Sequence, residues 1–189
     1  MRRFALIALA AAATACSDPN NQVYGGLNSS PPLVVRKVNS TIFGTVTTTN
    51  QAGKETTQDA VILSESDNLC GLLQQNPDLF KRTDLAYNAL ILMFPHNRLG
   101  SFNLVIGGDV AATFMASSGS SDGSSGSGIA FFGGNGYISV GDFDPGGNAK
   151  GNFDLIFFDS AQDSFEAYGN FQSDPCAAMT TAYIPRFDG

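Results

Sequence analysis

The sequence predicts an all-β fold, an antiparallel β-sandwich or partly open barrel of about eight strands with one short helix. Short apolar runs with a period of two residues recur along the chain. Glycine-rich or polar turn signals separate these runs at regular spacing, and a single segment has helical spacing. Many short strands with regular turns are typical of sandwiches and barrels.

The first expected strands lie in residues 41–47, 60–63 and 85–94. In residues 41–47, Ile42, Gly44 and Val46 alternate with three threonines and Phe43, as expected of a strand. Residues 85–94 are nearly all apolar, which fits a buried helix as well as a strand buried on both faces. The neighbouring strand signals favour the strand.

The expected helix occupies residues 67–75, with Asp67 as its N-cap. Leu69, Leu72 and Leu73 would then share one face of the helix. Residues 76–77, Asn-Pro, should end it.

Two hairpins are expected in the middle of the chain. Residues 101–106 and 110–114 flank a Gly-Gly-Asp turn, and residues 129–132 and 137–140 flank Gly-Gly-Asn-Gly. The serine- and glycine-rich residues 117–128 should form an exposed, flexible loop.

The C-terminal hairpin has the clearest alternation. Phe153, Leu155 and Phe157 should face inward, as should Phe165, Ala167 and Phe171 after a turn at residues 159–163. The outward positions hold polar side chains and Tyr168, joined by Ile156 and Phe158. This pattern predicts an antiparallel sheet with one face in water.

The N-terminus has the order of a secretory signal peptide: two arginines, an apolar run and small residues, over residues 1–15. Cys16 follows directly, so the segment resembles a bacterial lipoprotein signal, in which the cysteine is acylated, for example with palmitate, and becomes the new N-terminus. Ala13 stands where such signals usually have leucine, so an ordinary signal peptide cleaved nearby is the alternative. The apolar run is too short for a transmembrane helix, which needs about 20 residues.

Three segments follow: a signal peptide (residues 1–15), a flexible tether (16–32) and a β domain (33–189). Loss of Arg2 and Arg3 lowers the basic residues from 10 to 8 against 17 acidic ones, a formal charge of −9. This acidic balance argues against nucleic acid as a partner. The membrane contact would come from the lipid, and Ser17, where an inner-membrane retention signal commonly has aspartate, favours the outer membrane.

The chain has three cysteines. Lipidation of Cys16 leaves Cys70 and Cys176 as an even pair in an oxidising compartment, and we expect them to form a disulfide. Two buried free thiols are the alternative.

Four short motifs occur in a fixed order: QDAV at residues 58–61, NLC at 68–70, GNFDL at 151–155 and FEAYGNF at 165–171, before Cys176. They resemble a group of bacterial lipoproteins common in myxobacteria and related delta-proteobacteria. The resemblance covers residues 40–178, although the segment before Cys176 is longer here than in the group. It supports the fold and the cysteine pair, and it implies no catalytic residue.

Asp142, Asp144 and Asn148 form the best candidate metal site. Two carboxylates on a glycine-rich turn can offer oxygens to Ca²⁺. The loop departs from an EF-hand, because Gly146 and Phe153 stand at the fifth and twelfth positions. A plain hairpin turn explains the same residues.

Candidates for catalysis or sugar binding are few. His96 has no accompanying nucleophile motif, which favours an exposed turn histidine. The acids Asp154 and Glu166 fall on the expected outer face, where solvation explains them. Tyr137 and Tyr168 could stack on a sugar ring, since aromatic side chains are the usual platform for sugars.

The sequence thus predicts an exported, lipid-anchored protein of the cell envelope that acts as a structural or interaction module and is not an enzyme. The alternative is a domain that binds a small ligand or a glycan, with or without Ca²⁺. Its protein or glycan partner in the envelope is not identified by any motif.

Overall fold

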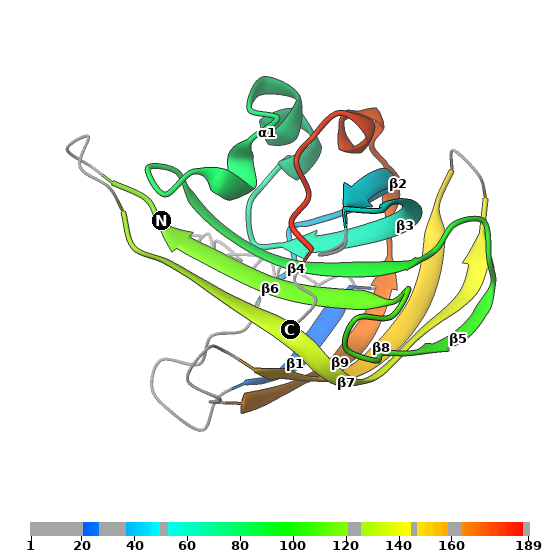
Figure 1. The fold of residues 1–189 in the computed structure, drawn as a ribbon. Helices are drawn as coiled ribbons and strands as arrows, with labels where there is room; N and C mark the ends of the chain where they lie inside the picture. The colour runs from blue at the N-terminus through cyan, green and yellow to red at the C-terminus, as the bar shows by residue number, and fades with distance from the viewer. Residues whose placement is uncertain are drawn as a thin grey trace, which may run out of the picture.

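A single curled β-sheet forms the framework in the computed structural model, which describes residues 21–26, 37–49, 53–120, 126–144, 147–158 and 164–186 (Figure 1). The strands are β1 (Gln22–Gly26), β2 (Ser40–Thr49), β3 (Glu55–Ser64), β4 (Ala86–Pro95), β5 (Gly100–Asn103), β6 (Ala111–Ser118), β7 (Gly128–Phe143), β8 (Ala149–Phe158), β9 (Ser164–Gln172) and β10 (Asp174–Pro175). The helices are α1 (Leu69–Gln75) and the 3₁₀ turns η1 (Leu79–Lys81) and η2 (Ala177–Thr180).

The sheet order is β1-β9-β8-β7-β6-β4-β3-β2-β10, and β5 pairs with β7 beside this path. Every pairing is antiparallel except that of β10 with β2. The sheet curls strongly into an open half-barrel (Figure 1). The predicted all-β class with one short helix is confirmed. Of the two architectures predicted, a sandwich or a partly open barrel, the single curled sheet matches the partly open barrel.

Two apolar layers lie on opposite faces of the sheet. The inner layer fills the curl and takes side chains from most of the strands, including Phe94, Phe114 and Phe157. The outer layer lies between β2, β3, β4 and β6 and the helices. Because β4 contributes Leu92 to the inner layer and Ile91 to the outer one, its nearly continuous apolar sequence is that of a strand buried on both faces.

A helical layer, made of α1, η1 and η2, covers the outer face of β2, β3, β4 and β6 (Figure 1). The disulfide between Cys70 and Cys176 joins α1 to the residue before η2, with the two Cα atoms 5.7 Å apart. The amide of Cys176 also donates to the carbonyl of Phe43 in β2, at 2.8 Å. The predicted cysteine pair is therefore present, and it ties the helical layer to the C-terminal segment.

Helix α1 begins one residue later than the predicted cap implies. Asn68, and not Asp67, is the N-cap, and its side-chain oxygen accepts from the amide of Gly71 at 3.2 Å. A helix that starts at Leu69 places both Leu69 and Leu73 in the outer layer, and the cap must then be the residue before it.

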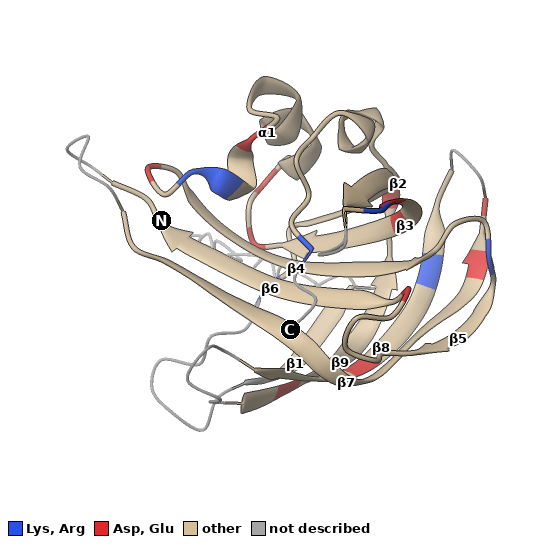
Figure 2. Cartoon of the chain, in the orientation of Figure 1, with Lys and Arg blue, Asp and Glu red and all other residues tan. Residues whose placement is uncertain are grey.

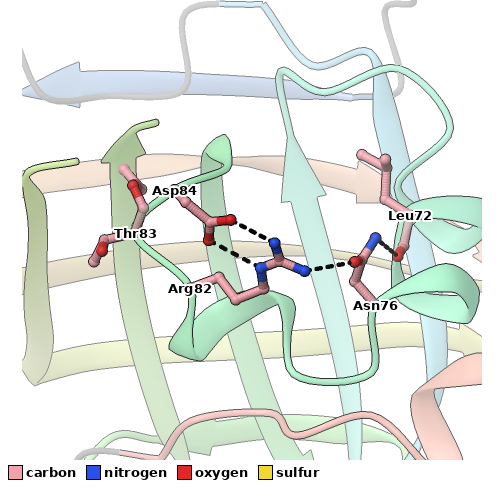
Figure 3. Close-up of polar contacts among 6 residues, drawn as sticks. Leu72, Asn76, Arg82, Thr83 and Asp84 are labelled. Atoms are coloured by element: carbon pink, nitrogen blue, oxygen red, sulfur yellow. Dashed lines mark hydrogen bonds and ion pairs between the residues drawn. The ribbon is translucent and has the colours of Figure 1, made fainter. Parts of the chain in front are cut away.

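The end of α1 lies at Asn76, as predicted, and is held by an arginine (Figure 3). Arg82 donates from Nη1 to Oδ1 of Asn76 at 3.0 Å and from Nε to Oδ1 of Asp84 at 2.9 Å. Its hydrogen bonds hold the pKa of Asp84 below the ordinary value. The planar guanidinium of Arg82 thus connects the end of α1 to the segment between η1 and β4.

Neither predicted middle hairpin forms. The turn at residues 107–109 exists, since the amide of Gly108 donates to the carbonyl of Val105, but β5 pairs with β7 and β6 pairs with β4. The physical reason is burial: β6 is apolar on both faces and belongs beside β4, whereas β5 is mostly exposed.

The Gly-Gly-Asn-Gly segment lies inside β7 and does not reverse the chain. A register shift between Gly133 and Asn135 marks an irregularity in the pairing with β8. Gly136 has a φ of +117°, and a Cβ there would lie 2.0 Å from the carbonyl oxygen of Asp154. These glycines permit a bulge and a close backbone approach.

Two further expectations, the tether and the serine- and glycine-rich loop, are wrong in part. The tether prediction is wrong at Gln22–Gly26, which forms edge strand β1 against β9. The loop prediction is wrong at its ends, because residues 117–118 belong to β6 and Gly128 to β7. The signal peptide, Cys16 and the turn at residues 159–163 lie outside the described residues. In the described ranges, no helix is long and apolar enough to cross a membrane.

Replacing Cys70 and Cys176 with serine should lower the free energy of unfolding by ~4–5 kcal/mol, since the bridge closes a long loop in the unfolded chain. The cysteines are 106 residues apart. Urea unfolding with and without reductant measures the effect. The double serine variant is the control, since its curve should not respond to reductant. A wild-type curve that is equally insensitive would contradict the prediction.

Candidate ligand-binding site

The outer face of β1, β9, β8 and β7 carries no helical layer in the described structure (Figure 1). Along β8 and β9 the outward side chains are exposed or half-buried, while the inward ones are buried. The one wet face predicted for the C-terminal hairpin is thus confirmed. Figure 2 shows that charged residues are sparse on the sheet.

Three tyrosines and an aspartate form one row across this face. Strand pairing places Tyr24 opposite Tyr168, Tyr168 opposite Asp154, and Asp154 opposite Tyr137. The exposed fraction is 49% for Tyr24, 46% for Tyr168 and 38% for Tyr137. We call this row, together with the row of Gln22, Asn170, Asn152 and Ser139 beside it, the tyrosine face.

The amide row lies two residues away along each strand. Pairing aligns Gln22, Asn170, Asn152 and Ser139. The hydroxyl of Tyr24 donates to the side chain of Gln22 at 2.5 Å, and the amide of Gln22 donates to Oδ1 of Asn170 at 3.1 Å. These contacts order the row at the sheet edge and connect it to the tyrosines.

A shallow hollow of about 350 Å³ lies between the two rows. The rings of Tyr24 and Tyr168 stack with centroids 5.6 Å apart and planes 25° apart, and Tyr137 borders the hollow across Asp154. The remaining lining residues are Gln22, Asn152, Phe153, Gly169 and Asn170. Aromatic rings and amide side chains therefore border the same hollow.

Asp154 occupies the centre of this arrangement. Its side chain is half-buried, and no hydrogen bond or ion pair from the described residues engages its carboxylate. A carboxylate can accept hydrogen bonds from hydroxyl or ammonium groups of a ligand. The hollow thus combines ring faces, amides and an available carboxylate, which suits a polar ligand with a ring.

A second polar cluster surrounds the buried Asp59. Its carboxylate accepts from the hydroxyl of Thr45 at 3.0 Å and from the amide of Asn97 at 2.7 Å, and it lies 2.8 Å from Nδ1 of His96. Since a carboxylate only accepts, Nδ1 carries the proton.

This aspartate–histidine pair is not arranged for nucleophilic catalysis. Nε2 of His96 lies 2.8 Å from the side-chain amide of Asn97, and the hydroxyl of Thr45 points to Asp59 instead of the imidazole. A nucleophile must donate to its base. The cluster instead clamps the turn after β4, where Asn97 has a positive φ of 56°. The prediction of a turn histidine fits this position.

The predicted calcium loop closes as a tight hairpin turn. The amide of Gly147 donates to the carbonyl of Asp144 at 2.7 Å, and the amide of Asp144 donates to the carbonyl of Asn148 at 3.1 Å. Asp142, Asp144 and Asn148 are exposed, and residues 145–146 lie outside the described part. The described residues contain no group of three or more His, Cys, Asp or Glu side chains that could hold a metal. The calcium prediction stays a prediction.

A larger hollow of about 460 Å³ lies beside Cys70, where β2 and β10 meet. Its lining combines polar residues such as Asn39 and Asn68 with apolar ones such as Ile42 and Leu69. Residues 27–36, which lie in the sequence between the lining residues Asn21 and Val38, are outside the described structure, and we assign no site to this hollow.

Tyr137 and Tyr168 were predicted from the sequence as candidates, whereas Tyr24 and the position of Asp154 between the rings were not. Tyr24 lies in a segment rich in turn residues, which concealed a strand. Val23 and Tyr24, two residues with high β propensity, are the signal in the sequence that could have indicated this strand. The row itself depends on strand register, which the sequence does not contain.

Known proteins give no further guidance: no family model, curated protein or solved structure matches the chain. The resemblance to the bacterial lipoprotein group therefore stays a prediction, and the geometry of the site is the guide to function.

Replacing Asp59 with alanine should lower the free energy of unfolding by about 1–3 kcal/mol, because the hydrogen bonds that its buried carboxylate makes with Thr45, His96 and Asn97 are lost. Chemical unfolding of the full chain measures this loss. Asp109→Ala is the matched control, since Asp109 is exposed and only its carbonyl is engaged, by Gln58. A surface change of this kind should stay within about 0.5 kcal/mol. Equal losses for the two variants would show that Asp59 does not clamp the turn.

Proposed function

We propose that this chain is a non-catalytic glycan-binding module of the bacterial cell envelope, held to the outer membrane by lipid on Cys16. The supporting observation is the tyrosine face, where three exposed tyrosines and an available carboxylate share one row beside a row of amides. The proposal combines the interaction module expected from the sequence with the glycan-binding alternative.

The chemistry of the tyrosine face fits sugars. Sugar rings present apolar C–H faces that pack on aromatic rings, and hydroxyl groups that need donors and acceptors. Tyr168 and Tyr137 supply ring surface, while Asn152 and Asn170 supply amides on the same side of the hollow. Ligand sites usually combine such apolar walls with a few placed polar groups.

A purely structural module is the competing proposal. Cross-strand aromatic pairs stabilise sheets by about 0.2–1 kcal/mol, and Tyr24 stacks on Tyr168. This contact explains two of the tyrosines. It gives no reason for Tyr137, which lies beyond Asp154 on β7.

The anchor predicts a specific effect of Cys16→Ser. The variant lacks the sulfur that is acylated, so it should leave the membrane fraction and partition into water instead of detergent. Phase partition and mass spectrometry of the mature N-terminus measure this change. Ser17→Ala is the control, since it keeps the sulfur and should stay with the membrane. Wild-type protein with an unmodified N-terminus would contradict the anchor.

Loss of the ring at Tyr168 should abolish or strongly weaken glycan binding. The probes are soluble hexamers of glucose, N-acetylglucosamine and glucosamine, titrated calorimetrically into the full chain. We expect at least one hexamer to bind, and Tyr168→Ala and Tyr137→Ala each to weaken it about tenfold or more, which corresponds to about 1.4 kcal/mol.

Tyr183→Ala is the matched control for these variants, because Tyr183 is 43% exposed and lies outside the tyrosine face, where it contacts Lys81. Its substitution should leave binding unchanged. If no hexamer binds to folded wild-type protein, or if Tyr168→Ala behaves like Tyr183→Ala, the glycan proposal is wrong.

A further inference from the structure

We infer that the tyrosine face selects a cationic sugar, a glycan residue with a free ammonium group, which Asp154 binds between Tyr168 and Tyr137. This inference rests on the proposed function and specifies its ligand class. The juxtaposition that carries it is a half-buried carboxylate paired in register with a tyrosine on each side.

The spacing suits a ligand of one sugar ring in width. Asp154 lies on β8, with Tyr168 on β9 and Tyr137 on β7. Neighbouring strands are about 4.8 Å apart, so the two tyrosine positions are separated by roughly 10 Å, with the carboxylate midway. Tyr24 stacks behind Tyr168 and supports that wall of the hollow.

The carboxylate of Asp154 has no partner among the described residues. A partly buried charge is stabilised when an opposite charge comes within about 4–6 Å. A ligand ammonium would supply that charge and would donate up to three hydrogen bonds. A neutral sugar offers only hydroxyl donors at the same place, so it gains less.

The surroundings do not neutralise Asp154. On the outer side of β8 the basic residue is Lys150, which lies opposite Asp142 and four residues from Asp154, about 13 Å along the strand. This exceeds the screening length of about 8 Å at physiological ionic strength. In the other direction, Ile156 is paired with the acidic Glu166. The local charge is therefore negative and disfavours anionic glycans.

The tyrosines add to the same preference. A cation near the face of an aromatic ring is stabilised by cation–π attraction. Tyr168 and Tyr137 border the hollow that contains Asp154, so one ammonium group can interact with the carboxylate and approach a ring. Ring faces and carboxylate thus favour the same ligand charge.

The amide row favours an amino sugar over other ammonium compounds. Asn152 and Asn170 line the hollow next to Asp154 and offer both donors and acceptors. A sugar has several hydroxyl groups to pair with them. A lysine side chain or a choline headgroup has one cationic end and no comparable set of hydroxyl groups.

Calorimetric titration of the full chain with two hexamers tests the inference. Glucosamine and N-acetylglucosamine hexamers share their backbone and differ in the charge on nitrogen. At slightly acidic pH we expect the glucosamine hexamer to bind at least tenfold more tightly, with an affinity that falls as salt is added. Asp154→Asn should remove that difference by weakening only the glucosamine hexamer.

Glu166→Gln is the matched control, since Glu166 is an exposed acid on the same outer face. It should keep the tenfold preference. Melting temperatures of both variants confirm that they are folded.

Equal affinity for the two hexamers, or an equal loss for both in Asp154→Asn, overturns the ammonium inference but leaves glycan binding in place. Binding of choline or a lysine-rich peptide, with neither hexamer bound, overturns both this inference and the proposed function.

Discussion

The structure depends on the helical layer that covers one half of the outer face of the sheet. Side chains such as Ile62, Ile91 and Met93 point away from the inner layer and are buried in the layer that α1, η1, η2 and the C-terminal Ile184 help to form. The layer consists of one short helix and two 3₁₀ turns, which are marginal by themselves. The Cys70–Cys176 bridge links its two ends, which are far apart in the sequence.

This partial cover explains the two kinds of strand in the sequence. Strand β4 and the second half of β3 are covered on both faces, and they carry apolar runs, residues 60–63 in β3 and residues 89–94 in β4. Strands β8 and β9 are covered on one face, and their side chains alternate between buried and exposed. The sequence could therefore predict which strands lie in the middle of the protein and which face water, without knowledge of their neighbours in the sheet.

Pairing partners were harder to predict than strands. The signals at residues 107–109 and 133–136 are local, and they indicate a turn wherever glycine occurs between apolar runs. Burial on both faces decides that β6 lies beside β4, and close backbone contact explains glycine at position 136. The tyrosine row is harder still, because it combines β1, β7, β8 and β9, and a shift of one residue in any pairing would turn a side chain to the other face. Tyr137 and Tyr168 could be named as candidates, but their alignment with Asp154 could not.

The composition of the uncovered half is unlike that of a face adapted only to water. A face that only contacts water is usually rich in charged residues such as lysine and glutamate, and this face has few of them. Tyr24 and Tyr168 help to hold edge strand β1 by stacking across the pair, so part of the row has a structural reason. Tyr137 has no such partner in the row, because the residue opposite it on β8 is Asp154. A ring on one side of a carboxylate is thus matched by a stacked ring on the other, and this arrangement is what supports the proposal of ligand binding at this half of the sheet.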